Sequence, residues 1–229
     1  TAAGWFKDAD EYNEAKQKML KSVYQNEGFW VGRYEAGSIS NRNSGDDNLT
    51  VPLSQKNIYP YKYVTRTQAK KIAEQVESGN HISSLMYGIQ WDLILTFMHN
   101  KGNIDNILFN EDSTSIGNYK NNELNILNKN AKYSIDSGKS FLKCPYKKDI
   151  VNGTLLTTGA DKSFSKLNIY DIAGNVWEWT LENTNDNNSP CVVRGGCSDN
   201  EGKDITANYR TYASIPDNYY YIGFRVVLY

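Results

Sequence analysis

Apolar side chains in the first hundred residues recur at three- and four-residue spacing, which is the period of one helix face. A first helix is predicted near the N-terminus, where this spacing is followed by Tyr12, Ala15, Met19, Leu20 and Val23. A second helix is expected over residues 65–76, because Thr65 and Gln68 have the spacing of a capping box at its start. A third is expected over residues 88–99, where Trp91, Ile94, Leu95 and Met98 share one face.

The rest of the chain has shorter and less regular patterns. Residues 38–50 are polar and predict an exposed loop, and residues 100–165 predict long irregular connections with one short hairpin. Short apolar runs divided by Gly, Asn and Asp predict strands at 29–35, 167–170, 176–181, 192–194 and 223–228. The expected fold class is α+β, with two or three helices packed on a twisted antiparallel sheet and long irregular loops.

Charge and hydropathy exclude two classes of partner. The 229 residues include 25 basic and 26 acidic side chains, whereas a nucleic-acid surface usually shows as an excess of basic residues. No apolar run is long enough to span a bilayer, so we expect no membrane insertion. The first residues contain no initiator Met, and the sequence is expected to start inside a longer chain.

Few side chains can hold a transition metal. The three cysteines, Cys144, Cys191 and Cys197, form no CxxC pair and are expected to be buried, unbridged thiols, with one disulfide plus a free thiol as the alternative. The two histidines, His81 and His99, lie far from any cysteine in the sequence. A zinc site is therefore not expected.

Four segments in fixed order carry a family resemblance: the run from Asn168 to Thr180 (NIYDIAGNVWEWT), then VRGG at 193–196, NYR at 208–210 and IGFRVV at 222–227. Together they closely resemble the formylglycine-generating-enzyme (sulfatase-modifying factor) family, which has a C-type lectin fold. Weaker similarity continues upstream through 85–92 and 63–76. The resemblance implies a domain over 29–229 preceded by an N-terminal helical segment, 1–28.

The family motifs also have a physical interpretation. Alternation along a strand places Trp177 and Trp179 on one face, where they are expected to lie in the core. Gly195 and Gly196 allow a tight turn. Arg194 and Arg225 are expected to form structural hydrogen bonds, and Glu178 and Asp171 are the expected partners.

The resemblance further implies a calcium ion near the GNVWEW segment in some members. Asn175 and Glu178 match that pattern and supply the hard oxygen ligands that Ca²⁺ prefers. No cofactor is expected to be required, and Ca²⁺ is the one candidate.

Catalytic relatives use two cysteines after the RGG turn to bind copper, which soft thiolates favour. This chain has Cys197 alone after the turn, and Cys191 precedes it by six residues on the other side of the strand. A related branch of iron-dependent sulfoxide synthases uses three histidines, and only two are present. The chain is therefore expected not to be an enzyme, with a formylglycine-type copper oxidase as the alternative.

A second use of this scaffold is implied by similarity to the variable proteins of diversity-generating retroelements in phages and bacteria. These proteins vary residues between the RGG and GFR segments through template adenines, which favours Asn, Tyr, Ser and Asp. Such residues are frequent here, and the expected ligand-binding residues are Ser198, Asp199, Asn200, Asp204, Asn208, Tyr209, Tyr212, Asp217, Asn218, Tyr219, Tyr220 and Tyr221.

The expected function is therefore ligand or receptor recognition, in a phage virion or at a bacterial cell surface. The ligand would be a surface protein or a glycan of a host cell or bacterium, and the oligomeric state is left open. Two alternatives remain. An AT-rich genome would also enrich Tyr and Asn, and the domain could instead be a structural module for assembly of a phage tail.

Overall fold

The computed structural model describes residues 6, 8–148 and 151–229. Its main helices are α1 (Ala9–Gln25), α2 (Arg66–Ala73), α3 (Gly88–Gly102) and the short α4 (Ile107–Asn110). The three predicted helices are all present. The capping box at α2 is confirmed, because the Gln68 amide donates to Thr65 Oγ1 at 3.2 Å and the Thr65 amide donates to Gln68 Oε1 at 3.0 Å.

Helix α2 ends three residues earlier than the sequence pattern indicates. The amides of Gln75 and Val76 donate to the carbonyls three residues before them, at 3.2 and 3.3 Å. The last turn is therefore tightened to i→i−3 hydrogen bonding, which continues the apolar periodicity without continuing the α-helix.

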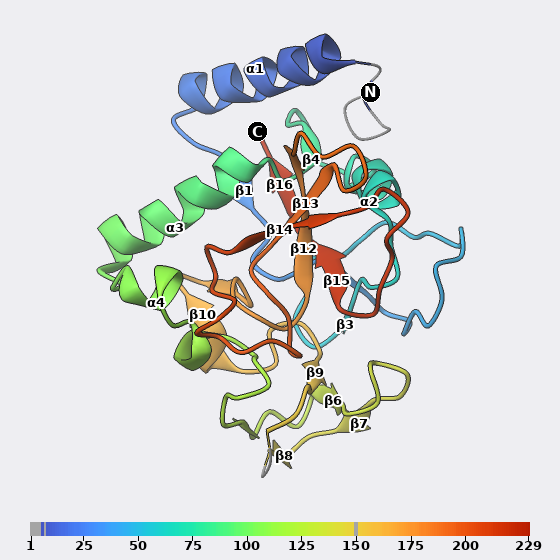
Figure 1. Cartoon of the computed structure of the whole chain (residues 1–229), viewed down its shortest axis with the longest axis vertical. Helices are drawn as coiled ribbons and strands as arrows, with labels where there is room; N and C mark the ends of the chain where they lie inside the picture. Colours follow the sequence, from blue (N-terminus) through green and yellow to red (C-terminus); the bar gives the residue numbers. More distant parts are fainter. Residues whose placement is uncertain (1–5, 7, 149–150) are drawn as a thin grey trace.

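The main sheet has four strands in the order β14-β13-β12-β15. Their bounds are β12 (Trp177–Asn183), β13 (Cys191–Arg194), β14 (Arg210–Ala213) and β15 (Ile222–Phe224). The expected antiparallel pairing is confirmed for β12 with β13 and for β13 with β14, whereas β15 at one edge pairs parallel to β12. The cause is that residues 214–221 carry the chain from one edge of the sheet to the other, as Figure 1 shows in red.

A second sheet has three strands in the order β1-β16-β4, and it pairs the C-terminal strand with two strands from the first half of the chain. It consists of β1 (Trp30–Val31), β4 (Ser83–Leu85) and β16 (Val226–Leu228). Two strand predictions need correction here. The strand expected over 29–35 is reduced to Trp30–Val31, and the strand expected over 223–228 is divided at Arg225 between β15 and β16, which belong to different sheets.

Arg225 is the reason for that division. Its guanidinium is fully buried. Its Nη2 lies 2.6 Å from Glu178 Oε1 on β12 and donates to the Tyr170 carbonyl at 2.8 Å. Its Nη1 donates to the Gly32 carbonyl at 2.9 Å. The Arg225–Glu178 pair that the sequence analysis expected is confirmed. It connects the main sheet to the segments that follow β1 and β11 (Ile169–Tyr170).

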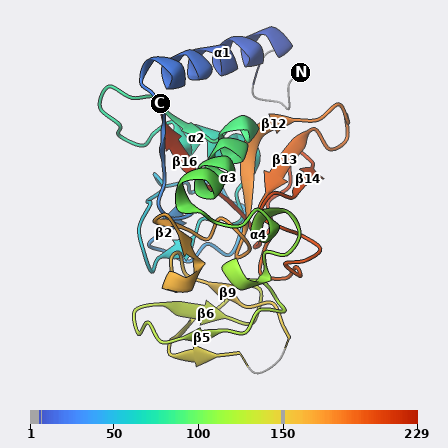
Figure 2. The same cartoon turned by 90° about the vertical axis from the view of Figure 1, so that its left-hand side faces the viewer.

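Residues 100–165 contain more secondary structure than the single hairpin predicted. In addition to α4, they hold η1 (Thr114–Ile116), η2 (Lys162–Phe164), β5 (Asn125–Ile126), β6 (Lys132–Ser134), β7 (Leu142–Lys143), β8 (Tyr146–Lys147) and β9 (Leu155–Leu156). The strands form two small ladders, β5-β8 and β7-β6-β9, at the lower end of the molecule in Figure 2. Strands of two or three residues are too short to show a period in the sequence.

The next hairpin pairs β11 with β10 (Ser165–Lys166), and β2 (Gly37–Ser38) pairs with β3 (Tyr59–Pro60). The strand predicted over 167–170 is shorter than expected at its start. Leu167 and Asn168 have φ angles of 48° and 65° and form the turn of the hairpin instead.

The principal hydrophobic core lies where α2 and α3 contact the main sheet. Trp91 and Trp179 are fully buried there, and both indole nitrogens donate to backbone carbonyls. Trp177, 7% exposed, is also in the core, so the predicted burial of both motif tryptophans is confirmed. Met19 of α1 belongs to the same core, and α1 lies across one end of the molecule (Figures 1 and 2).

Replacing Arg225 by Met is expected to lower the free energy of unfolding by about 3–5 kcal/mol, because Glu178 would keep a buried carboxylate without its partner. Denaturant unfolding followed by tryptophan fluorescence measures this change. The matched control is Lys203→Met, which removes an exposed ion pair with Glu201 and is expected to change little. Equal effects of the two substitutions would contradict the role given to Arg225.

Candidate ligand-binding surface

Arg194 ends β13 and holds the frame around the RGG turn. Its side chain is fully buried, with Nη2 2.5 Å from Asp92 Oδ1 on α3 and Nη1 3.2 Å from Glu182 Oε2 on β12. The expected structural role is confirmed for Arg194. The expected partners, Glu178 and Asp171, are wrong for this arginine, since the carboxylates come instead from Asp92 and Glu182.

The two glycines after Arg194 adopt backbone conformations that favour glycine. Their φ angles are 87° for Gly195 and 78° for Gly196. A Cβ on Gly195 would lie 3.0 Å from the Trp91 ring, and one on Gly196 would lie 2.9 Å from Ile205. The turn is therefore restricted by both conformation and space, and it directs Cys197 into the interior.

Cys197 is in the core and 2% exposed. Its amide donates to Asn200 Oδ1 at 2.9 Å. Burial raises the pKa of the Cys197 thiol to about 12, so the thiol is protonated at neutral pH. Cys144 and Cys191 are also buried, and all three thiols are free. The prediction of buried, unbridged cysteines is confirmed.

Asn175 and Glu178, the pair that matches the family calcium pattern, have their oxygens occupied by protein groups. Asn175 Oδ1 accepts from Asn118 Nδ2 at 2.9 Å and from the Leu156 amide at 3.0 Å. Both Glu178 oxygens accept from Arg225. Neither side chain offers a free oxygen ligand, so this arrangement does not fit a calcium ion held by these two residues, and we assign no step to calcium.

Three buried carboxylates share the surroundings of Arg225: Glu35, Asp171 and Glu178. Glu35 Oε2 accepts from Asn175 Nδ2 at 2.7 Å, and Asp171 Oδ2 accepts from the Gly159 amide at 2.7 Å. Burial raises the pKa of Glu35 well above its ordinary value and raises the pKa of Asp171 to about 7. One guanidinium cannot balance three negative charges, and protonation relieves the excess.

The residues of the predicted binding surface separate into two groups. The first, called the tyrosine cluster below, consists of Tyr209, Tyr219, Tyr220 and Tyr221. Tyr219 and Tyr221 stack at a centroid distance of 5.2 Å, and Tyr220 meets Tyr221 edge-on at 5.0 Å. The Tyr220 hydroxyl donates to Asp199, and burial raises the pKa of Tyr220 to about 12.

Trp177 positions this cluster. The rings of Trp177 and Tyr209 lie 6.1 Å apart, and the Trp177 amide donates to the Tyr221 carbonyl at 2.8 Å. Tyr209 and Tyr219 are 40% and 45% exposed. Trp177 therefore contacts Tyr209 through its ring and the other three tyrosines through the backbone at Tyr221.

The second group lies along β14. Tyr212 is 62% exposed. Asn208 is exposed and spans the gap to α4, since its Nδ2 donates to Asn110 Oδ1 at 2.8 Å and its Oδ1 accepts from Arg194 at 3.3 Å. Arg210, between them in the sequence, forms ion pairs with Glu182 at 3.1 Å and Asp92 at 3.5 Å.

The remaining predicted residues are less available for a ligand. Ser198 is 1% exposed and lies outside any accessible surface. Asn200 and Asp217 are half-buried and hold backbone amides, and Asn218 is half-buried beside Gly45. Asp204 is exposed in the turn before β14.

Three residues that form the ion pairs near Tyr212 were not among the predicted site residues: Asp92, Glu182 and Arg210. Arg210 is part of the NYR segment, and its carboxylate partners could have been sought among acidic residues near the other motifs. The pairing itself depends on α3 lying beside the sheet, which no spacing in the sequence indicates.

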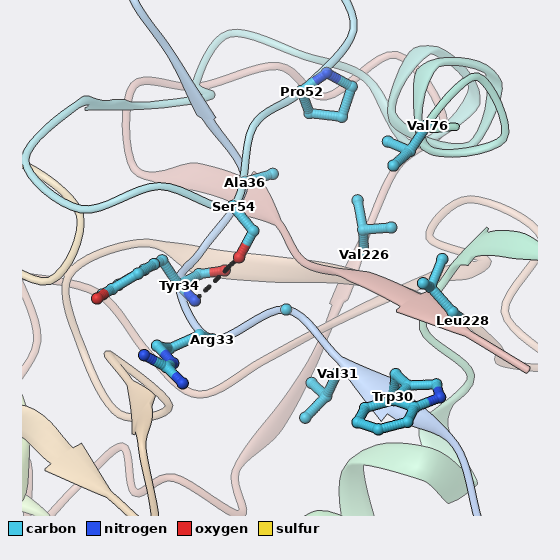
Figure 3. Close-up of a pocket in the computed structure, with 11 residues that line it drawn as sticks. Trp30, Val31, Arg33, Tyr34, Ala36, Pro52, Ser54, Val76, Val226 and Leu228 are labelled. Atoms are coloured by element: carbon cyan, nitrogen blue, oxygen red, sulfur yellow. Dashed lines mark hydrogen bonds between the residues drawn. The ribbon is translucent and has the colours of Figure 1, made fainter. Parts of the chain in front are cut away.

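A separate apolar pocket of about 270 Å³ lies away from these groups, between β1, β16 and the end of α2. Figure 3 shows Trp30 and Leu228 at one end of it and Pro52 and Val76 at the other. The Tyr34 amide donates to Ser54 Oγ at 3.2 Å, and Arg33 is the only charged side chain among the lining residues. The pocket is thus apolar and holds no paired acid and base.

The described part of the chain holds neither a metal-ligand cluster nor a helix that could span a bilayer. No group of three or more His, Cys, Asp or Glu side chains is placed to hold a metal ion there. None of the helices within it has the length and apolar character to cross a bilayer.

Comparison with solved structures places the fold in a known class. The structure named CarF has a TM-score of 0.51 at 14% identity, covering 95% of this chain and 81% of CarF. PvdO from Pseudomonas aeruginosa has a score of 0.48 at 15% identity, covering 87% and 80%. Treponema denticola variable protein 1 has a score of 0.49 at 14% identity, covering 87% and 84%.

The sulfatase-modifying factor enzyme 1-like domain matches residues 109–229. Because the match spans more than half of the sequence, the chain belongs to this family, and the expected fold of the formylglycine-generating-enzyme type is confirmed. No curated protein matches the sequence. The expected boundary between residues 28 and 29 stays a prediction.

The contribution of Asp171 to the free energy of unfolding is expected to fall as pH rises from about 4 to about 7. The folded pKa of about 7 exceeds the ordinary value near 3.9, so the folded state binds a proton in this range that the unfolded state has lost. Asp171→Asn is expected to be more stable than the parent protein at pH 8. The difference in the free energy of unfolding is expected to decrease by up to about 1.4 kcal/mol per pH unit and to vanish toward pH 4.

Urea unfolding at several pH values measures that difference. Asp204→Asn, at an exposed carboxylate, is the control and is expected to leave the pH profile unchanged. A constant difference between Asp171→Asn and the parent protein at all pH values would show that Asp171 does not titrate in this range.

Proposed function

We propose that this protein is a non-catalytic recognition protein that binds a ligand on a cell surface through the tyrosine cluster and the residues along β14. The observation that carries the proposal is the exposure of Tyr209, Tyr212 and Tyr219 on a rigid frame. Tyrosine gives a large amphipathic contact area at a low cost in side-chain entropy, and exposed tyrosines are frequent in binding surfaces.

The frame supports this proposal because it limits the motion of the tyrosines. Strand β14 is held by four consecutive residue pairs with β13, and Arg194 fixes the end of β13 through two carboxylates. A preorganised surface loses less entropy on binding. Affinity would then arise from a few aromatic anchors, with the polar residues around them contributing specificity.

The state of Cys197 argues against the copper oxidase alternative. Copper(I) is bound by thiolates, whereas the single thiol in this position is buried and has a pKa raised to about 12. A cysteine in a pair with lowered pKa would be the reactive form. Cys197 instead fills space in the core beneath the tyrosine cluster.

We further propose that the surface varies within a phage or bacterial system, as the residue types between the RGG and GFR segments suggest. Tyr212, Tyr219 and Asp204 are exposed, and substitutions there would leave the frame intact. Asn208 and Asp217 make hydrogen bonds that support the fold. Diversification would therefore be concentrated at the exposed tyrosines and their polar neighbours.

Combined replacement of Tyr209, Tyr212 and Tyr219 by Ala is expected to reduce cell binding at least about a hundredfold, because each lost aromatic anchor removes at least about 1 kcal/mol and the three together about 3 kcal/mol. Flow cytometry of the fluorescently labelled protein on a panel of bacterial strains measures this. The matched control is Tyr24→Ala, at a tyrosine of α1 that is 86% exposed. Retained adsorption together with altered assembly of the virion or surface structure would favour the assembly function.

Purified protein loaded with copper(I) is expected to show no oxidation of thiol peptides, because a buried, protonated thiol does not provide a copper ligand. Cys197→Ser is expected to keep the same cell binding as the parent protein. Oxygen consumption with a cysteine-containing peptide measures turnover. Copper-dependent turnover that Cys197→Ser abolishes would establish the oxidase and overturn the non-catalytic proposal.

A further inference from the structure

A polar groove of about 370 Å³ runs beside β14 and the loop that joins β12 to β13. Its volume is near the lower end of small-molecule sites, which measure about 300–1,000 Å³. We call it the β14 groove, and its main lining residues are Glu182, Asn183, Asn185, Asp186, Arg210 and Tyr212. Figure 2 shows the loop projecting beyond the two strands.

Tyr212 provides the single aromatic wall of this groove. It pairs with Val192 of β13, so its backbone is fixed by the sheet. Its ring is 62% exposed and meets no other aromatic ring in the described chain, and its hydroxyl has no hydrogen-bond partner there. The ring is therefore held in place at the backbone and open to a ligand on its face.

The charged groups of the groove lie beside Tyr212, because Arg210 and Tyr212 are two residues apart on β14 and share one face of the sheet. Arg210 lies 3.1 Å from Glu182 Oε1, while the other Glu182 oxygen pairs with the buried Arg194. The guanidinium of Arg210 is thus fixed, yet its side chain is 50% exposed. Two hydrogen-bonding groups that a ligand can use, the Arg210 donors and the Glu182 acceptors, are preorganised beside each other.

The loop contributes hydrogen-bonding groups with capacity left over. Asn183 Oδ1 accepts from Arg66, which leaves the Asn183 amide hydrogens without a partner among the described residues. Asp186 Oδ1 caps the amide of Asn188 at 2.8 Å, and its second oxygen has no partner there. Asn185 is exposed and can donate and accept.

We propose that the β14 groove binds a terminal mono- or disaccharide of a cell-surface glycan. A pyranose ring has an apolar C–H face that matches an exposed aromatic face, and its hydroxyl rim matches the surrounding donors and acceptors. A protein epitope would place an apolar anchor in an apolar pocket, whereas this groove is polar apart from Tyr212 and Val192. The inference deepens the proposed recognition function and rests on it.

The charges favour a neutral sugar. Two carboxylates, Glu182 and Asp186, and one guanidinium, that of Arg210, line the groove. Arg210 is already paired with Glu182 at 3.1 Å. The local balance is one negative charge in excess. An acidic saccharide, such as a sialic or uronic acid, would meet that excess without a free cation.

A glycan microarray with neutral and acidic oligosaccharides tests the inference on the full chain. The parent protein is expected to bind neutral glycans. Tyr212→Ala is expected to lose at least about tenfold in apparent affinity, and Tyr212→Phe is expected to retain binding because the ring face is kept. The control Tyr24→Ala, at an exposed tyrosine of α1 outside the proposed surface, is expected to match the parent protein. Unchanged unfolding midpoints of the variants exclude loss of the fold as the cause.

The outcomes distinguish this inference from the proposed function. Cell binding that resists periodate treatment, is abolished by proteinase and is unchanged in Tyr212→Ala would overturn the saccharide site and leave a protein-binding surface. Binding of acidic glycans alone, or equal losses in Tyr212→Ala and Tyr212→Phe, would also overturn it. Absence of binding to both the array and every cell type would overturn the saccharide site and the recognition function together.

Discussion

The buried ion pair between Arg225 and Glu178 is the interaction on which the arrangement of the main sheet and the β1-β16-β4 sheet depends. Arg225 lies at the break between β15 and β16, and its guanidinium reaches Glu178, Gly32 and Tyr170. Arg225 thus joins the C-terminal part of the chain to the segment after β1 and to residues 170–178. A buried charge without partners is costly, so alternative pairings of these segments are disfavoured. The ion pair thereby fixes the positions of β12 and β15, next to which the tyrosine cluster lies.

Arg194 has a corresponding role at the end of β13, with one difference. Its carboxylate partners are partly exposed, at 45% for Asp92 and 20% for Glu182. The same carboxylates also pair with Arg210, which is half exposed. The buried frame is therefore continuous with the surface beside Tyr212, and a ligand there would meet groups whose positions are set by the core.

The RGG turn determines which residues of the segment that follows it are buried and which are exposed. Two glycines in left-handed conformations place Cys197 and Ser198 inside the molecule and return the chain to the surface at Asp204 and Asn208. A buried thiol with a raised pKa has little reactivity.

The family, the order of its motifs, the three helices and the pairing of Arg225 with Glu178 could all be predicted from the sequence. Helix α2 illustrates the reason. Its capping box and apolar stripe involve residues a few positions apart, so the interactions that form the helix can be recognised in a short stretch of sequence. The short strands between residues 100 and 165 have no such local signature. The parallel pairing of β15 with β12 also escaped prediction, since it depends on how residues 214–221 cross the sheet.

The candidate site divides in the same way. Residue types indicated a Tyr- and Asn-rich surface between Arg194 and Phe224, yet only the tertiary structure separated the exposed Tyr209, Tyr212 and Tyr219 from the buried Ser198. Asp92 reaches Arg194 from 102 positions away in the sequence, and the β14 groove combines residues of β12, β13 and β14 with the loop that joins β12 to β13. Burial and long-range pairing are properties of the packed chain, so composition determined the kind of surface and tertiary contacts determined where it lies.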